Sequence, residues 1–198
     1  MPVRFTTVDQ LSALAQAAAG GDRAAMAGFL TAAYEPVWRL CAAVVDAQSA
    51  DDLAQESFVR ALGAIAGFRG ESSARTWILS IARHTCMDEL RSRVRRRDRD
   101  SSVMRAQGQP EPPSPDPAEQ VALESLVRTL ETDQRLAFVL TQVVGLSYEE
   151  AAKVCGCPIG TIRSRVARAR TTLIASLDAT EVPPKRRARS ARPEPNDQ

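Results

Sequence analysis

The feature that most constrains this chain is a proline-rich segment just past its middle. Residues 107–120 read QGQPEPPSPDPAEQ and hold five of the twelve prolines, with no large apolar residue. Such a stretch cannot bury itself in a core and acts as a semi-extended spacer. The 198 residues are therefore predicted to fold as two domains, one on each side of it.

Composition favours helices in both domains. Apolar residues make up 44% of the chain and charged residues 25%, which is enough for a hydrophobic core, while aromatic residues reach only 5%. Sheet-rich domains depend on aromatic and β-branched residues, whereas Ala and Leu, abundant here, favour helix. We expect an all-α protein with five parts: an N-terminal helix or extension at 1–21, a helical bundle at 22–99, a flexible linker at 100–118, a second helical domain at 119–180 and a disordered basic tail at 181–198.

Targeting and metal-binding signals are absent from the sequence. The first 30 residues lack the pattern of a signal peptide, and no apolar run approaches the roughly 18 residues of a membrane span. Cys155 and Cys157 stand closer together than the usual metal-ligand pairs, and the single histidine, His84, is remote from them. We expect a cytoplasmic protein with reduced, structural cysteines and with no metal or other cofactor.

The first half shows helical spacing throughout. Asp22 is predicted to cap a helix running toward Leu40, with Pro36 kinking or breaking it, and Ser49 to cap the next helix by bonding its first amides. A further helix is expected at 74–94. One buried stripe is predicted to comprise Ala54, Phe58, Ala61, Leu62 and Ile65.

The second half shows shorter helices. Thr132 is a candidate N-cap, Ser147 and Glu150 form a capping box, and residues 155–158 form a turn before the last helix. The predicted inward face of that helix comprises Ile162, Val166, Ala169, Leu173, Ile174 and Leu177. Two short helices and a Gly-containing turn, with arginines at the start of the second, indicate a helix-turn-helix, although an amphipathic hairpin gives a similar pattern.

These stretches resemble the extracytoplasmic-function (ECF) sigma factors of bacterial RNA polymerase. SYEEAA at 147–152, GCPIGTIRSR at 156–165 and RAR at 168–170 are similar to region 4 of that family. DDLAQESF at 51–58 resembles the core-polymerase-binding motif of region 2, and the stretches FRG at 68–70, TWI at 76–78 and IARH at 81–84 resemble its promoter-melting segment. The resemblance covers residues 22–96 and 119–178.

The resemblance implies a non-enzymatic subunit whose partners are the clamp and flap of core RNA polymerase, promoter DNA and an anti-sigma factor. The implied core-binding residues are Asp51, Asp52, Gln55, Glu56 and Phe58. The implied minus-ten contacts are Phe68, Arg69, Gly70, Ser72, Ser73, Trp77, Arg83, His84 and Arg91. We expect the last three of these residues to share one helix face. The implied minus-thirty-five contacts are Ser147, Thr161, Arg163, Ser164, Arg165, Arg168 and Arg170.

One position departs from the family pattern, and other functions stay open. His84 stands where the family usually has an Asn implied to read a flipped minus-ten base, and imidazole offers its donor and acceptor in a different geometry. His84 could equally be structural. A helix-turn-helix regulator that acts without polymerase would have a similar second half, but no reason to carry the motifs at 51–58 and 68–77. A nucleic-acid-modifying enzyme would need a catalytic set, which the sequence lacks.

Overall fold

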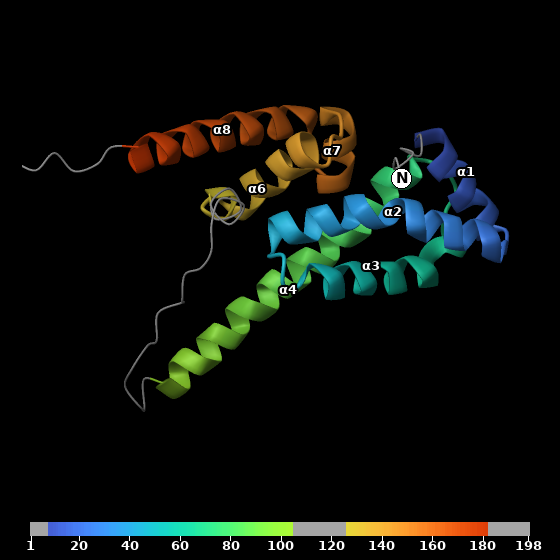
Figure 1. Cartoon of the computed structure of the whole chain (residues 1–198), viewed down its shortest axis with the longest axis horizontal. Coiled ribbons are helices and arrows are strands. Elements are labelled where there is room, and N and C mark those ends of the chain that lie inside the picture. The colour runs from blue at the N-terminus through green and yellow to red at the C-terminus, as the bar shows by residue number, and fades with distance from the viewer. Residues whose placement is uncertain (1–7, 105–125, 182–198) are drawn as a thin grey trace, which may run out of the picture.

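The computed structural model describes residues 8–104 and 126–181, and every element within those ranges is a helix (Figure 1). This agrees with the all-α expectation. The elements are α1 (Val8–Ala19), α2 (Arg23–Val44), α3 (Ala50–Ala64), the 3-10 turn η1 (Ile65–Gly67), α4 (Ala74–Met104), α6 (Thr132–Phe138), the π-helical turn η2 (Val139–Val143), α7 (Tyr148–Cys155) and α8 (Ile159–Glu181).

Two predicted caps fix where helices begin. A carboxylate oxygen of Asp22 accepts hydrogen bonds from the amides of Ala24 and Ala25 at 2.8 and 3.1 Å, which satisfies amides that have no partner inside the helix. Ser147 and Glu150 form the predicted capping box at the start of α7. Gly156 then ends α7 in the left-handed conformation, with φ of 63°, and so produces the sharp turn into α8.

Helices α1 to α4 form the first bundle. Its core includes Phe29, Val37, Ile78 and the thiols of Cys41 and Cys86, whose sulfur atoms lie 3.6 Å apart. The hydrogen bond to the Cys41 thiol, together with burial, raises the pKa of Cys86, so it stays protonated. Helix α1, in the segment expected as an N-terminal helix or extension, contributes buried Leu11, Ala15 and Ala18 to the same core.

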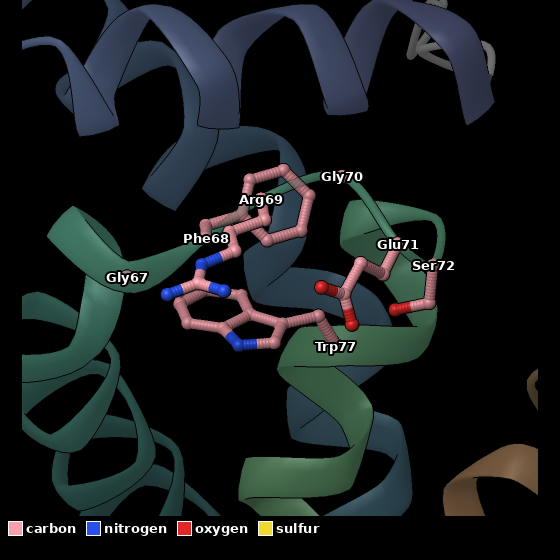
Figure 2. A pocket seen from close by; sticks show the side chains of 7 residues that line it. All are labelled: Gly67, Phe68, Arg69, Gly70, Glu71, Ser72 and Trp77. Carbon is pink, nitrogen blue, oxygen red and sulfur yellow. The ribbon is translucent and has the colours of Figure 1, made fainter.

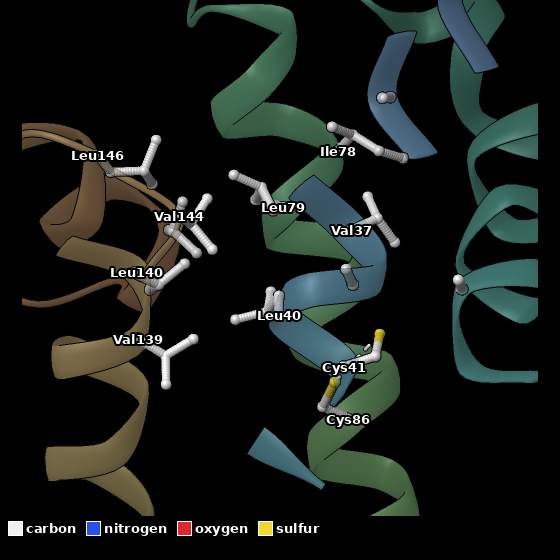
Figure 3. Packing of buried hydrophobic residues seen from close by; sticks show 14 of the residues in the cluster. Val37, Leu40, Cys41, Ile78, Leu79, Cys86, Val139, Leu140, Val144 and Leu146 are labelled. Atoms are coloured by element: carbon white, nitrogen blue, oxygen red, sulfur yellow. Dashed lines mark hydrogen bonds between the residues drawn. The ribbon is translucent and has the colours of Figure 1, made fainter. Parts of the chain in front are cut away.

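The second bundle consists of α6, η2, α7 and α8, and it packs directly against the first. Leu40 and Leu79 of the first bundle face Val139, Leu140, Val144 and Leu146 of the second (Figure 3), and all of these side chains are buried. Arg135 of α6 donates a 2.8 Å hydrogen bond to the carbonyl of Val44, one of the last carbonyls of α2, and Arg75 donates to the carbonyl of Val144. The two bundles therefore share one continuous core.

Three details of the expected helices are wrong. Pro36 does not break α2, because Ala33, Val37 and Leu40 are fully buried and hold the turns on both sides of it. Ser49 occupies the N-cap position of α3 without capping it, since its hydroxyl instead accepts a 2.7 Å hydrogen bond from Arg93. Thr132 is the first residue of α6, and its N-cap is Glu131.

The predicted inward stripes are also wrong at their ends. Leu62 is 47% exposed on α3, and Ile174 and Leu177 are 59% and 51% exposed on α8. Helix α8 continues past the end of α6 (Figure 1), so its last turns have no neighbouring helix there to cover them. Helix α4 continues to Met104, into the segment expected as linker, while the rest of that segment and the basic tail lie outside the described residues.

Candidate functional site

The residues expected to bind polymerase lie together on one exposed side of α3, here called the acidic face. Asp51, Asp52, Gln55 and Glu56 are exposed, and Phe58 is half-buried. Glu56 accepts a 2.9 Å hydrogen bond from Arg60, whose guanidinium also reaches Asp88 of α4 at 2.8 Å. Of the three carboxylates on this face, Glu56 is thus paired with Arg60, whereas the Asp52 carboxylate has no hydrogen bond within the described part of the chain.

An apolar hollow adjoins the acidic face. Leu30, Thr31, Tyr34 and Phe58 line a space of about 430 Å³. The rings of Tyr34 and Phe58 are stacked with their centroids 6.2 Å apart, and the Tyr34 hydroxyl donates a 2.5 Å hydrogen bond to Asp51. That bond raises the pKa of Tyr34 above its usual value. Sequence reasoning missed Tyr34, because only the packing of α2 on α3 brings it to this face.

The segment after η1 forms an aromatic pocket of about 360 Å³ (Figure 2). The rings of Phe68 and Trp77 lie 5.3 Å apart between centroids at an angle of 55°, and the Arg69 side chain runs from the loop toward the Trp77 ring. The lining residues are Gly67, Phe68, Arg69, Gly70, Glu71, Ser72 and Trp77. Gly67 and Glu71 were not among the predicted contacts, although Glu71 lies within the predicted segment and Gly67 directly precedes it.

Helix α1 supports this loop from behind. Gly70 has a φ of 74°, and a Cβ atom there would lie 2.9 Å from the Gln16 side-chain nitrogen. The Ser12 hydroxyl accepts a 3.1 Å hydrogen bond from the Ala74 amide. Ser73 does not line the pocket; its hydroxyl accepts a 3.1 Å hydrogen bond from the Thr76 amide and so stabilises the first turn of α4.

An exposed face of α4 continues from the pocket. Trp77, His84 and Arg91 are seven residues apart, which is close to two helical turns, so they share one side of the helix. His84 is exposed, and Arg91 pairs with Asp88 at 2.6 Å. Because Arg60 and Arg91 both bond to Asp88, the pKa of that carboxyl lies below its usual value.

Arg83 does not share that face, contrary to the sequence prediction. One position corresponds to about 100° around a helix, which turns Arg83 away from His84 and toward α7. Its Nη1 atom is 3.5 Å from Nε2 of His84, but its Nε atom is buried with no hydrogen-bond partner. Burial raises the pKa of Cys155 on α7 to about 11, against the opposing effect of the Arg83 charge.

Helix α8 presents the recognition face, which comprises Thr161, Arg163, Ser164 and Arg168. Arg163 and Arg168 are exposed, and neither guanidinium makes a hydrogen bond or ion pair with the residues the structure describes. The Ser164 hydroxyl donates a 2.9 Å hydrogen bond to the Thr161 carbonyl. Ser147 stands at the start of α7, where its hydroxyl accepts a 3.1 Å hydrogen bond from the Glu150 amide.

The other two predicted arginines of α8 bond within their own bundle. The Arg165 guanidinium forms an ion pair with Asp133 of α6, and its Nη1 atom donates to the sulfur of Cys157 at 3.8 Å. Arg170 donates a 2.9 Å hydrogen bond to the Gln142 side chain. Asp133 and Gln142 carried no sequence signal, because they lie 32 and 28 residues away from their partners.

The described residues contain neither a cluster of metal-ligating side chains nor a membrane-spanning helix. Within 8–104 and 126–181, His, Cys, Asp and Glu side chains nowhere gather in threes as metal ligands would. None of the described helices combines the length and the apolar character needed to cross a membrane.

Comparison with known families matches both halves of the chain. The model of sigma-70 region 2 matches residues 30–96, and the model of sigma-70 region 4 matches residues 120–173. The sequence is 46% identical over 176 residues to the ECF RNA polymerase sigma factor SigC of Mycobacterium tuberculosis, covering 88% of this chain and 95% of that protein. It is 37% identical over 147 residues to the RNA polymerase sigma-H factor of Pseudomonas aeruginosa, covering 68% and 76%.

Solved structures show the same arrangement of helices. CnrH in complex with the cytosolic domain of CnrY is similar with a TM-score of 0.65 and 25% identity, over 87% of this chain and 99% of that one. The sigma factor RpoE in complex with the anti-sigma factor NepR, from Bartonella quintana, is similar with a TM-score of 0.61 and 30% identity, over 75% and 94%.

Proposed function

The chain belongs to the sigma-70 family, as an ECF sigma factor that binds core RNA polymerase and directs it to promoters, and we propose that its three exposed surfaces divide this work among them. The observation that carries the proposal is their placement along the chain. The acidic face and the aromatic pocket lie within the region 2 match, and the recognition face lies within the region 4 match. Each surface offers the chemistry that one binding partner requires: the polymerase clamp, the minus-ten element or the minus-thirty-five element.

The acidic face is proposed to bind the polymerase clamp. Exposed carboxylates attract a basic partner and increase its association rate, while the apolar hollow beside them supplies area that is released from water on binding. Val59, 62% exposed, and Leu62 extend the apolar area along α3. Asp51, Asp52, Gln55, Glu56 and Phe58 therefore remain the proposed core-binding residues, joined now by Tyr34.

The aromatic pocket is proposed to hold an unstacked base of the minus-ten element. Removing a base from the stack costs a few kcal/mol, which stacking on an aromatic ring and hydrogen bonds to the base edge must offset. Trp77, which is partly exposed, supplies the ring, buried Phe68 packs against it, and Arg69, Glu71 and Ser72 supply polar groups around the opening. The melted strand then follows the exposed face of α4 past His84 toward Arg91.

The recognition face is proposed to read the minus-thirty-five element. The major groove, about 12 Å wide, admits one helix, and side chains near the start of that helix reach base edges. Arg163 lies in the first turns of α8, and Arg168 lies further along, where phosphates are the nearer partners. Ser147 and Arg170 flank this face and are proposed to meet phosphates as well.

Three further properties follow as proposals from this role. All three surfaces are proposed to bind polymerase or DNA, and the chain is proposed to catalyse no reaction of its own. Its work on polymerase and promoter DNA places it in the cytoplasm. The similar CnrH and RpoE structures are complexes with CnrY and with the anti-sigma factor NepR, and an anti-sigma factor is proposed to bind this chain too.

The test is reconstitution with core polymerase, followed by run-off transcription over a library of promoters. The wild-type chain is expected to yield transcripts only from templates that carry suitable minus-ten and minus-thirty-five elements. Replacing both Asp52 and Glu56 by Lys should abolish core binding with helicity unchanged, because exposed acids contribute little to folding. Glu131→Lys, an exposed acid on the second bundle, is the matched control. Sequence-specific binding to duplex DNA with no need for polymerase would instead identify a helix-turn-helix regulator.

A further inference from the structure

The arginines of α8 look equivalent in the sequence, but the structure gives Arg165 a different task from its neighbours. We propose that Arg165 is a positioning residue that fixes the recognition helix in place, while Arg163 and Arg168 contact the DNA. This inference rests on the proposed role of α8 at the minus-thirty-five element. It assigns the sequence preference of that helix to Arg163 and removes Arg165 from the set of base-reading residues.

The contacts of Arg165 join three elements. Its guanidinium pairs with Asp133 in the first turn of α6 and donates to the Cys157 sulfur in the turn between α7 and α8. The Arg165 side chain is 23% exposed, although the Asp133 side chain is 54% exposed. One side chain on α8 thus sets the angle between this helix, the preceding turn and α6.

The position of Arg165 around the helix fits this role. Ile162, Val166 and Ala169 are fully or almost fully buried and define the inward side of α8. At about 100° per residue, Arg165 lies some 60° from the middle of that side, whereas Arg163 and Arg168 lie about 100° and 120° from it in opposite directions. Arg165 therefore sits at the edge of the core, and the other two arginines point outward.

The charge of Arg165 is also unavailable to DNA. A carboxylate in direct contact neutralises the guanidinium, so moving Arg165 to a base or phosphate would first require breaking this ion pair next to a polyanion that repels Asp133. Arg170 differs, because its partner is the neutral amide of Gln142, which leaves the Arg170 charge uncompensated. The salt dependence of DNA binding consequently distinguishes a neutralised arginine such as Arg165 from an arginine with an uncompensated charge such as Arg170.

The experiment measures holoenzyme binding to promoters with matched and altered minus-thirty-five sequences at several salt concentrations. Arg165→Ala and Asp133→Ala should each weaken all sequences by the same factor, roughly threefold to tenfold, and the double variant should lose no more than either single one. The order of sequence preference and the slope of affinity against salt should stay as in the wild type. Loss on Asp133→Ala is diagnostic, because removing an acid near DNA would otherwise strengthen binding.

Matched variants keep the result interpretable. Arg163→Ala should change the order of sequence preference, and Arg168→Ala should reduce the salt slope by about one. The exchanged pair, Asp133→Arg with Arg165→Asp, should recover binding lost in the single variants and covers the case in which Arg165→Ala does not fold. A changed preference in Arg165→Ala, with Asp133→Ala binding as well as wild type, would overturn the positioning role. If Arg163→Ala and Arg168→Ala both bind like wild type, the proposed role of α8 itself fails.

Discussion

Helices α4 and α8 carry the two arginine clusters of the described chain, and the structure uses them differently. On α4, Arg91, Arg93 and Arg96 pair with carboxylates of the first bundle, namely Asp88, Glu89 and Asp46, while Arg95 and Arg97 are exposed and form no ion pair with the described residues. On α8, two of the four arginines have no partner among the described residues, and those two are the most outward-facing. An arginine cluster in a sequence therefore does not measure the positive charge available to DNA; nearby carboxylates decide that.

The same pair of helices differs in how each is held. Helix α4 packs against α1, α2, α3 and α7, so its apolar residues are covered as far as Leu90, and Val94 beyond it is 56% exposed. Among the described residues, helix α8 packs mainly against α6 and α7, and its last turns expose their leucine and isoleucine side chains. Region 2 is thus built around α4, whereas region 4 presents α8 at its surface, as a helix that must enter a groove requires.

The largest expected effect tests this difference in packing. Leu79 on α4 is fully buried at the junction of the two bundles, whereas Ile174 on α8 is 59% exposed. Leu79→Ala should lower the free energy of unfolding by about 2–5 kcal/mol, since it leaves a cavity in the shared core. Ile174→Ala should change it by less than about 0.5 kcal/mol. Urea unfolding followed by circular dichroism gives both values, and equal losses would contradict the comparison.

The next effect concerns DNA binding by the unpaired arginines. Arg163→Ala should weaken binding to the preferred minus-thirty-five sequence by about 1–3 kcal/mol and reduce its advantage over other sequences, as loss of a bidentate contact to guanine would. Its unfolding free energy should match the wild type, because the side chain makes no bond within the described protein. Fluorescence anisotropy with labelled promoters measures the first, and thermal unfolding the second. A destabilised Arg163→Ala would show that this arginine also has a structural partner.

A smaller effect tests the paired arginines of α4. Arg93 bonds to Asp46, Glu89 and Ser49, so Arg93→Ala should cost about 1–2 kcal/mol of stability, a value limited by the partial exposure of these groups. Arg97→Ala, at an exposed position with no such bonds, is the control. A stable Arg93→Ala variant with weakened DNA binding would show that Arg93 contacts DNA and does not stabilise the first bundle.

The pH dependence of that effect has a definite sign. Burial of Asp46 opposes its ionisation, but the bonds from Arg93 and Ser49 outweigh burial and hold the pKa of Asp46 below its usual value. A carboxyl with a lowered folded-state pKa stabilises the fold above its unfolded pKa of about 3.9 and loses that contribution as the pH falls. The stability difference between wild type and Arg93→Ala should therefore be largest near neutral pH and shrink below about pH 4. A difference that grows on acidification would exclude this ion pair as its cause.

The smallest expected effect concerns the one exposed α4 residue that departs from the family pattern. His84→Asn should change which minus-ten sequence is preferred by up to about 1 kcal/mol, because the amide presents a donor and an acceptor together. Binding to the minus-thirty-five element should be unaffected. Transcription from promoters varied at each minus-ten position provides the comparison. Identical preference profiles would assign His84 a structural role.

Local signals in the sequence predicted much of the fold. Asp22, Ser147 and Gly156 act through bonds to residues within a few positions, so their roles were visible in the chain itself. Leu62, Ile174 and Leu177 were misassigned because helical spacing identifies an apolar stripe but not whether another helix covers it. The hydroxyl of Ser49 was misassigned for a related reason, since its partner Arg93 lies 44 positions away.

In the candidate site, too, features set by residues close in sequence were predictable, and features set by contacts between helices were not. Most of the aromatic pocket was predictable, because its lining comes from one continuous segment and a tryptophan shortly after it. Tyr34, Asp133 and Gln142 were not, since each reaches its partner only when two helices pack together. The direction of Arg83 could have been found from helical phase alone, which separates it from His84 by about 100°.

The contact between α1 and the pocket loop bears on how such proteins can be recombined. Gly70 approaches Gln16 so closely that a side chain at position 70 would displace it, and Ser12 holds the amide of Ala74 where the loop ends. A chimaera that receives residues 68–73 from another sigma factor therefore receives only part of a unit whose other part is α1. Transplanted promoter preference should follow the loop faithfully only when the α1 residues at positions 12 and 16 are exchanged with it.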